Sequence, residues 1–169
     1  MCRLCGEFIE LHSKILDLGC GSGIIGREFQ KYFKSELLGV DIKKNLIKDI
    51  PFQLASGEYL PFKEKSFDVV LLNFVLHHTK DPEQVLREAK RVGKKIIIFE
   101  DLPKGWLGRL FCLIHGESFA IFFQKTRNYG NFKSEREWEN IFEKLKLEVI
   151  YKKRVANFPI RKELFVLRT

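Results

Sequence analysis

The fold of this chain is decided by residues 14–26, which read KILDLGCGSGIIG. Residues 14–18 predict a short buried strand, the glycines predict a tight turn, and residues 24–33 have the apolar spacing of a helix. Glycine suits such a turn because it tolerates positive φ and lets a ligand approach the bare backbone. The helix N-terminus behind the turn then offers free N–H groups and a partial positive charge. The stretch therefore predicts the opening of a βαβ nucleotide-binding unit.

The glycines are compatible with two kinds of ligand. Residues 21–26 match the G-x-G-x-x-G dinucleotide fingerprint, and Asp41 follows eighteen residues beyond Gly23. Alternatively, Asp17-x-Gly19-x-Gly21-x-Gly23 resembles motif I of the class I S-adenosylmethionine (SAM)-dependent methyltransferases. Asp17 favours the second interpretation, because a carboxylate contributes nothing to a pyrophosphate, whereas SAM carries an ammonium and a sulfonium near that point.

Composition predicts one globular domain over residues 1–169, whose first residues, 1–13, form a short N-terminal tail. The chain is 45% apolar and 31% charged, and its longest apolar stretch, residues 106–123, is interrupted by charged residues. Four cysteines do not suggest a disulfide framework, so a reducing cytoplasm is expected. Cys2-x-x-Cys5 with His12 would be only part of a zinc site, and no metal is expected. The net charge of +8 permits nucleic acid as a partner, but no RNA-binding motif accompanies it.

Apolar runs and capping signals divide the rest of the chain into alternating elements. Asp81 predicts an N-cap before Pro82, with Gln84 completing a capping-box pair, and Ser134-x-x-Glu137 predicts a second capping box. Strands are expected at residues 36–41, 52–55, 69–72, 95–100, 147–151 and 163–167, and helices at 44–48, 82–92 and 135–145. This alternation predicts a doubly wound α/β fold whose ligands lie beyond the carboxyl ends of the strands.

The middle of the chain resembles the type 11 methyltransferases, the group that includes ubiquinone- and menaquinone-biosynthesis enzymes. The resemblance covers residues 14–100 and is carried by Glu58-x-Leu60-Pro61-Phe62, Ser66-Phe67-Asp68-Val69-Val70, Val75-Leu76-His77-His78, Asp81-Pro82, Val85-Leu86-Arg87-Glu88-Ala89 and Arg91-Val92. It implies a Rossmann-like, seven-stranded, mostly parallel sheet with an antiparallel C-terminal strand and helices on both faces. It also implies SAM as cofactor and S-adenosylhomocysteine as product.

The same resemblance implies a cofactor site. Asp17 would approach the methionine ammonium, Asp41 would bind the ribose diol, and Ile42 would pack on the adenine. Ser56 stands where the family usually has an aspartate, so the adenine amino group would meet a hydroxyl. The remaining implied cofactor residues are Gly19, Cys20, Gly21, Gly23, Gly57, Glu58 and Asn73.

Methyl transfer requires alignment of donor and acceptor rather than a fixed catalytic motif. His77 and His78 are candidate general bases, and packing of one and solvation of the other is the alternative. Asn73 is followed by Phe74-Val75, which argues against amide or exocyclic-amine targets. Residues 102–131 are rich in aromatic side chains and could form a lid over an apolar acceptor. The sequence thus favours methylation of a small molecule; a silent SAM-binding subunit, an RNA or protein methyltransferase and a nicotinamide dehydrogenase remain as alternatives. Its oligomeric state is not determined.

Overall fold

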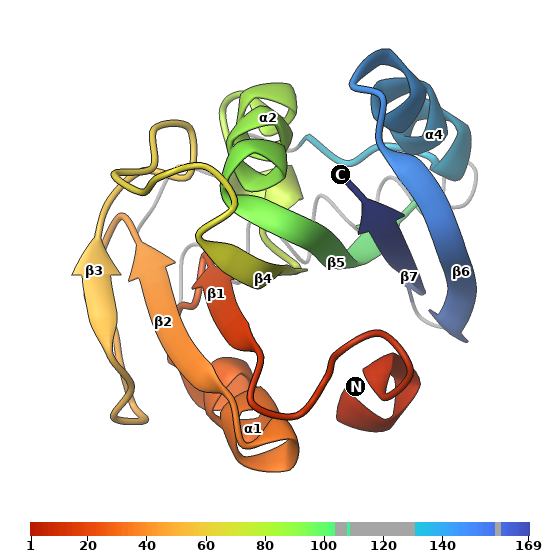
Figure 1. Ribbon diagram of the computed structural model, residues 1–169. Coiled ribbons are helices and arrows are strands. Elements are labelled where there is room, and N and C mark those ends of the chain that lie inside the picture. Colours follow the sequence, from red (N-terminus) through yellow and green to blue (C-terminus); the bar gives the residue numbers. More distant parts are fainter. Residues whose placement is uncertain (104–107, 109–130, 158–159) are drawn as a thin grey trace.

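The computed structural model describes residues 1–103, 108, 131–157 and 160–169. Seven strands form one sheet in the order β3-β2-β1-β4-β5-β7-β6 (Figure 1). Pairing is parallel from β3 to β5, and β7 runs antiparallel to both of its neighbours, β5 and β6. The predicted doubly wound sheet with an antiparallel C-terminal strand is confirmed.

The elements follow the predicted alternation closely. The strands are β1 (Lys14–Leu18), β2 (Glu36–Asp41), β3 (Phe52–Leu54), β4 (Phe67–Asn73), β5 (Gly93–Leu102), β6 (Glu148–Ala156) and β7 (Arg161–Arg168). The α-helices are α1 (Ile24–Phe33), α2 (Pro82–Val92) and α4 (Glu135–Lys144), and short 3-10 helices form η1 (Cys2–Cys5) and η2 (Leu76–His78).

Helices cover both faces of the sheet (Figure 1), and an apolar cluster lies on each face. On one face, α2 and α4 pack their buried side chains, including Leu86 and Trp138, against alternate residues of the central strands. On the other face, Phe29 and Phe33 of α1 join a second cluster. Strands buried on both faces are typical of parallel sheets covered by helices, so each central strand reads as a continuous apolar run.

The N-terminal segment, residues 1–13, packs on the sheet. Cys5 and Ile9 are fully or almost fully buried in the α1-side cluster. The Phe8 ring lies 4.8 Å from that of Tyr151 on β6, and Lys95 donates a hydrogen bond to the Phe8 carbonyl. The segment therefore covers part of the sheet that α1 leaves open.

The short helix expected at residues 44–48 is absent, and that prediction is wrong. The backbone N–H groups of Ile47 and Lys48 donate to the carbonyl of Ser22 in the glycine loop, at 2.9 and 3.1 Å. These donors are therefore not available for a helical ladder. The segment supports the glycine loop instead, because the backbone of Gly23 lies against Leu46 and Ile50.

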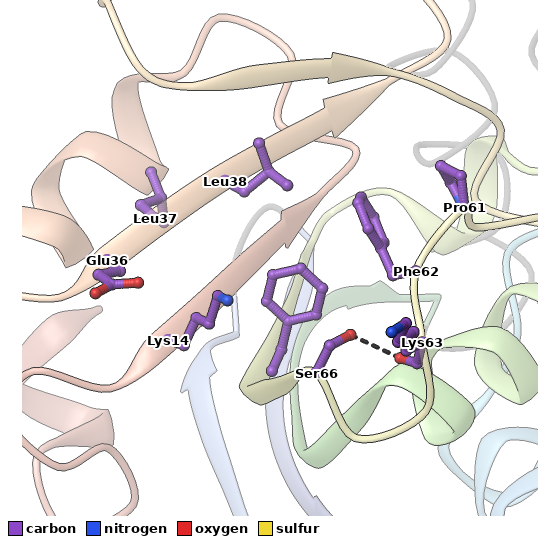
Figure 2. A pocket seen from close by; sticks show the side chains of 9 residues that line it. Lys14, Glu36, Leu37, Leu38, Pro61, Phe62, Lys63 and Ser66 are labelled. Carbon is purple, nitrogen blue, oxygen red and sulfur yellow. Dashed lines mark hydrogen bonds between the residues drawn. The ribbon is translucent and has the colours of Figure 1, made fainter.

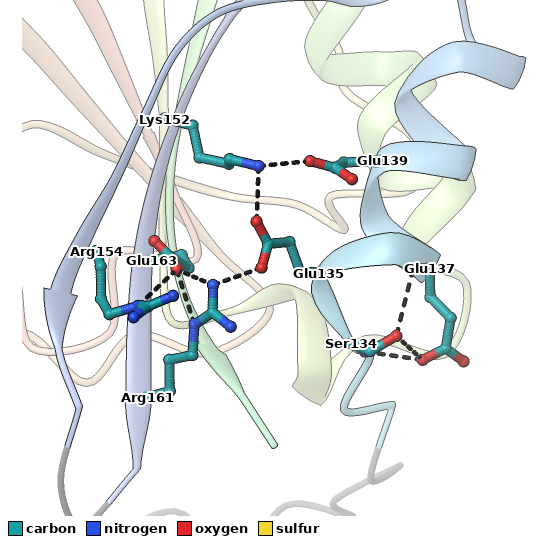
Figure 3. A network of polar contacts seen from close by, with 8 residues as sticks. All are labelled: Ser134, Glu135, Glu137, Glu139, Lys152, Arg154, Arg161 and Glu163. Carbon is teal, nitrogen blue, oxygen red and sulfur yellow. Dashed lines mark hydrogen bonds and ion pairs between the residues drawn. The ribbon is translucent and has the colours of Figure 1, made fainter. Parts of the chain in front are cut away.

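A network of ion pairs ties α4 to the outer strands (Figure 3). Glu163 of β7 is 2% exposed and pairs with Arg161 and Arg154, while Arg161 also bonds Glu135 of α4. The predicted Ser134–Glu137 capping box is present at the start of this helix. Together these contacts hold α4 over the antiparallel edge of the sheet.

Candidate functional site

A cavity of about 650 Å³ opens at the carboxyl ends of β1, β2, β4 and β5. Its volume lies in the range of roughly 300–1,000 Å³ typical of small-molecule sites. All the predicted site residues except Gly23 line it, namely Asp17, Gly19, Cys20, Gly21, Asp41, Ile42, Ser56, Gly57, Glu58, Asn73, His77 and His78. The sheet therefore brings together predicted residues from four separate segments of the sequence, 17–21, 41–42, 56–58 and 73–78.

The glycine loop adopts the backbone that its sequence predicts. Gly19, Gly21 and Gly23 all have positive φ, between 50° and 74°. A Cβ at Gly19 would lie 2.2 Å from Val75, whereas one at Gly21 would meet no atom within 4 Å. Gly19 is thus required for packing, and Gly21 presents bare backbone to the cavity.

Asp17 is held at the tip of β1 with almost no exposure to solvent. Asn73, at the end of the neighbouring strand β4, donates a hydrogen bond of 3.3 Å to Asp17 Oδ1. Burial raises the pKa of Asp17 to about 7 against the opposing effect of this bond. A Cβ at Gly26 would lie 2.4 Å from Oδ2, so the third glycine of the fingerprint makes room for this carboxylate beside α1.

Two acceptor atoms at this point lack a partner among the described residues. Asp17 Oδ2 and Asn73 Oδ1 are both buried there without a well-formed hydrogen bond, and the Gly26 N–H is the backbone donor that acts on the Asp17 carboxylate. Buried acceptors without donors are costly, and a bound cation with N–H groups would satisfy both. The residues therefore fit the ammonium end of SAM, which the sequence resemblance places here.

Asp41 ends β2 and faces the cavity beside the loop. Its Oδ2 accepts the Gly21 N–H at 2.9 Å, and its Oδ1 accepts the Lys43 N–H at 3.2 Å. Each carboxylate oxygen has a further lone pair, so the group can still accept both hydroxyls of a ribose. Ile42 is 60% exposed at the cavity wall and offers an apolar face to an adenine.

The segment that follows β3 is attached to α2 by polar contacts. Asp81 caps α2 as predicted, but the Gln84 side chain donates to the Glu58 carbonyl rather than completing a capping box. The Asp81 N–H is instead accepted by Glu58 Oε1 at 3.0 Å. The prediction of a capping-box pair is therefore wrong, because Glu58 takes the role expected of Gln84.

Arg91 of α2 explains why the Leu60-Pro61-Phe62 motif occurs together with the α2 residues of the resemblance. Its guanidinium donates to the carbonyls of Phe62 and Leu60, at 2.6 and 2.9 Å, and to Glu88. Glu88 in turn accepts the Leu60 N–H. These contacts fix residues 60–62 on α2, and none of these residues lines the cavity.

Cys20 packs behind the loop. Its thiol lies against Gly39 of β2, where an added Cβ would come within 2.9 Å of Sγ. Burial raises the pKa of Cys20 to about 12, so it remains a neutral thiol. Gly23 does not line the cavity, because its backbone packs on residues 46–50.

His77 and His78 lie at the other end of the cavity, in η2. His77 is buried, and its Nδ1 pairs with the carboxylate of Glu100 at the end of β5. Burial lowers the pKa of His77, but the charge and hydrogen bond of Glu100 outweigh it and raise the pKa above its ordinary value. His78 has its ring centroid 4.0 Å from that of His77.

Asp101 and Lys162 also line this end of the cavity. Lys162 Nζ lies 3.0 Å from Asp101 Oδ1 and 4.4 Å from the centroid of the Phe74 ring. The two residues are 61 positions apart and meet through the antiparallel pairing of β5 and β7. No local sequence signal could have indicated this pair. The predicted lid, residues 102–131, lies almost wholly outside the described residues.

A second hollow, of about 350 Å³, lies at the opposite end of the sheet (Figure 2). It is bounded by the beginnings of β1 and β2 and by residues 61–67, with the rings of Phe62 and Phe67 edge to face at 5.2 Å. It contains none of the predicted site residues. Over the described parts of the chain, no group of His, Cys, Asp and Glu is arranged to hold a metal ion. No helix within those parts has the length and apolarity needed to cross a membrane.

Comparison with known proteins identifies the same kind of domain. Residues 16–98 match the family described as a methyltransferase domain. An uncharacterised protein of Methanocaldococcus jannaschii is 38% identical over 104 residues, which are 57% of this chain and 48% of that protein. The demethylmenaquinone methyltransferase of Thermotoga maritima is 30% identical over 112 residues, 58% of this chain and 49% of that enzyme. The chain thus spans about half the length of these relatives.

A solved structure shows the same fold over nearly the whole chain. The crystal structure of a SAM-dependent methyltransferase from Methanosarcina mazei superposes with a TM-score of 0.76 at 19% identity. The match covers 98% of this chain and 96% of that one.

Proposed function

The chain belongs to the class I SAM-dependent methyltransferases of type 11, and on that basis we propose that it transfers a methyl group from SAM to a small-molecule acceptor. The observation that carries the proposal is the pair of unpartnered buried oxygens, Asp17 Oδ2 and Asn73 Oδ1, beside the glycine loop. A cationic cofactor is the ligand that these atoms suit best, whereas a dinucleotide would bring a pyrophosphate.

The proposed binding mode places SAM at the end of the cavity formed by the glycine loop, Asp17 and Asp41. Asp17 and Asn73 would hold the ammonium, the backbone at Gly19 and Gly21 would lie along the methionine part, and Asp41 would accept the ribose hydroxyls. When bound, SAM supplies a methyl carbon activated by the sulfonium. The protein would contribute alignment and exclusion of water.

A small acceptor is supported by the shape and chemistry of the other end. The cavity continues past Asn73 to His77, Asp101 and Lys162, and its whole volume is about 650 Å³. This space suits an acceptor of modest size next to the cofactor. The described cysteines Cys2, Cys5 and Cys20 are free thiols, which supports the expected cytoplasmic setting.

The test is a calorimetric titration of the purified protein with SAM, S-adenosylhomocysteine and NAD in parallel. We expect the two adenosyl ligands to bind and NAD not to bind. Asp41→Asn should weaken both adenosyl ligands by about 10- to 100-fold, since a hydrogen bond to a charged group contributes about 1.5–3 kcal/mol. Binding of NAD alone would overturn the proposal.

A further inference from the structure

The end of the cavity beyond Asn73, which we call the acceptor end, contains a buried histidine–carboxylate pair. His77 Nδ1 is paired with Glu100 Oε1, and the two residues are 4% and 1% exposed. His77 follows β4 and Glu100 lies near the end of β5, so the pair joins the carboxyl ends of two adjacent strands. Of the two, His77 lines the cavity and Glu100 stands behind it.

Both members of the pair are fixed in orientation. The His77 ring stacks on Phe132 at 4.5 Å with an interplanar angle of 18°, and the Asn131 N–H donates to the His77 carbonyl. Glu100 Oε1 also accepts the Asp101 N–H at 2.9 Å. The carboxylate is therefore held in place by its own strand, and the imidazole by its stacking partner.

We infer that Glu100 is a positioning residue that keeps the proton of neutral His77 on Nδ1 and leaves Nε2 as the ring nitrogen available to the methyl acceptor. A carboxylate beside Nδ1 stabilises the Nδ1–H tautomer and the imidazolium that forms when Nε2 takes a proton. No described residue bonds Nε2. The inference rests on the proposed function, because it assigns His77 a role at the acceptor.

The proton transfer that this arrangement supports is balanced. The proton of the acceptor's nucleophilic atom passes to Nε2 of His77, and the electron pair left on that atom forms the bond to the methyl carbon. The pair of the broken carbon–sulfur bond stays on sulfur, which becomes a neutral thioether. The new charge on His77 lies against Glu100, so it is not left unpaired in a buried site.

Four charged or titratable groups surround the imidazole. Glu100 and Asp101 of β5 raise the pKa of His77, Lys162 of β7 lowers it, and the His78 ring lies beside it in η2. Replacing Glu100 by glutamine keeps the shape of the side chain and removes the larger negative contribution. We therefore expect the pKa of His77 to fall in Glu100→Gln.

The experiment compares wild type, Glu100→Gln and a matched control, Glu163→Gln. Glu163 is also a buried glutamate of the same sheet, but its partners are Arg154 and Arg161. Imidazole nitrogens are observed by ¹⁵N NMR across a pH series, with the His77 signals identified from their loss in His77→Gln. Carbethoxylation of His77 by diethyl pyrocarbonate, mapped by mass spectrometry, reports whether Nε2 can be reached from the cavity.

We expect His77 of the wild type to be the Nδ1–H tautomer above its pKa and to react with diethyl pyrocarbonate. In Glu100→Gln the Nε2–H tautomer should increase, and the midpoint of reactivity should move to lower pH. Glu163→Gln should leave both unchanged. A wild-type His77 in the Nε2–H form, or one that does not react, would overturn the inference even if Glu100→Gln fails to fold.

Calorimetric titration of the same proteins with SAM separates this inference from the proposed function. If the wild-type protein does not bind SAM, the proposed function is refuted, whatever the tautomer of His77. SAM binding with the wrong tautomer refutes the inference alone.

Discussion

Asp17 places an ionisable group where its charge is costly until a cation binds. Its pKa rises from an ordinary value of 3.8 to about 7 because it is buried. One unit of pKa difference between the folded and unfolded states corresponds to about 1.36 kcal/mol. At pH 8, ionisation of Asp17 therefore lowers the free energy of unfolding of the ligand-free protein by up to about 4 kcal/mol. The folded state keeps a proton that the unfolded state loses between pH 3.8 and about 7, so this contribution to stability is lost as pH rises through that window.

Asp17→Asn removes this cost. The variant should be more stable than wild type by up to about 4 kcal/mol at pH 8, and the gain should disappear near pH 4. Asn73 Oδ1 has no partner among the described residues and can accept from the new amide, so the substitution need not leave a donor unpaired. Urea unfolding of the SAM-free protein at several pH values measures the difference.

SAM binding should respond in the opposite direction. Binding of the cation requires ionised Asp17, so wild-type affinity should fall about tenfold for each pH unit below 7. Asp17→Asn should bind SAM about 100-fold or more weakly at pH 8 and lose this pH dependence, because a buried charge pair has lost one member. Calorimetry measures both effects.

Asp68→Asn is the matched control. Asp68 lies at the far end of the sheet, where the Lys14 N–H and Lys94 lower its pKa. Its substitution should destabilise the protein at neutral pH and leave SAM binding unchanged. If Asp17→Asn is less stable than wild type at pH 8, or if wild-type affinity is constant from pH 5.5 to 8, the reasoning about Asp17 is refuted.

Other predictions concern the loop, its support and the N-terminal segment. Gly19→Ala should lower the thermal midpoint of unfolding markedly, because the added Cβ would lie 2.2 Å from Val75. Gly21→Ala should destabilise the protein only by the strain of positive φ, about 1–2 kcal/mol, but should abolish SAM binding measured by calorimetry. Equal stability of the two variants would contradict this prediction. Arg91→Met should destabilise by about 1–3 kcal/mol in urea, since two loop carbonyls lose their donor. Ile9→Ala should cost about 2–4 kcal/mol, whereas no change in urea would mean that the N-terminal segment does not pack as described.

The elements that open the fold could be predicted because their signals are local. The strand at residues 14–18, the helix at 24–33 and the helix at 82–92 have the predicted bounds. Apolar periodicity and N-capping act over a few residues, so a short window of sequence contains the information. The glycines of the loop likewise predict backbone with positive φ, because this preference depends on the residue type alone.

Predictions failed where a local pattern competed with a distant contact. Residues 44–48 do not form a helix, because the Ser22 carbonyl takes their N–H groups. Gln84 does not complete a capping box, because Glu58 accepts the Asp81 N–H instead. In both cases a residue more than twenty positions away decides the hydrogen bonding.

The sequence by itself determined the βαβ opening, the doubly wound sheet and the residues at the carboxyl ends of its strands. Only the tertiary structure decided which side chains meet there: Asn73 with Asp17, Glu100 with His77, and Asp101 with Lys162. The physical reason is that strand identity follows from short-range periodicity, whereas these pairs depend on which strands are neighbours and on their register. The geometry of the acceptor end is therefore a property of the assembled sheet.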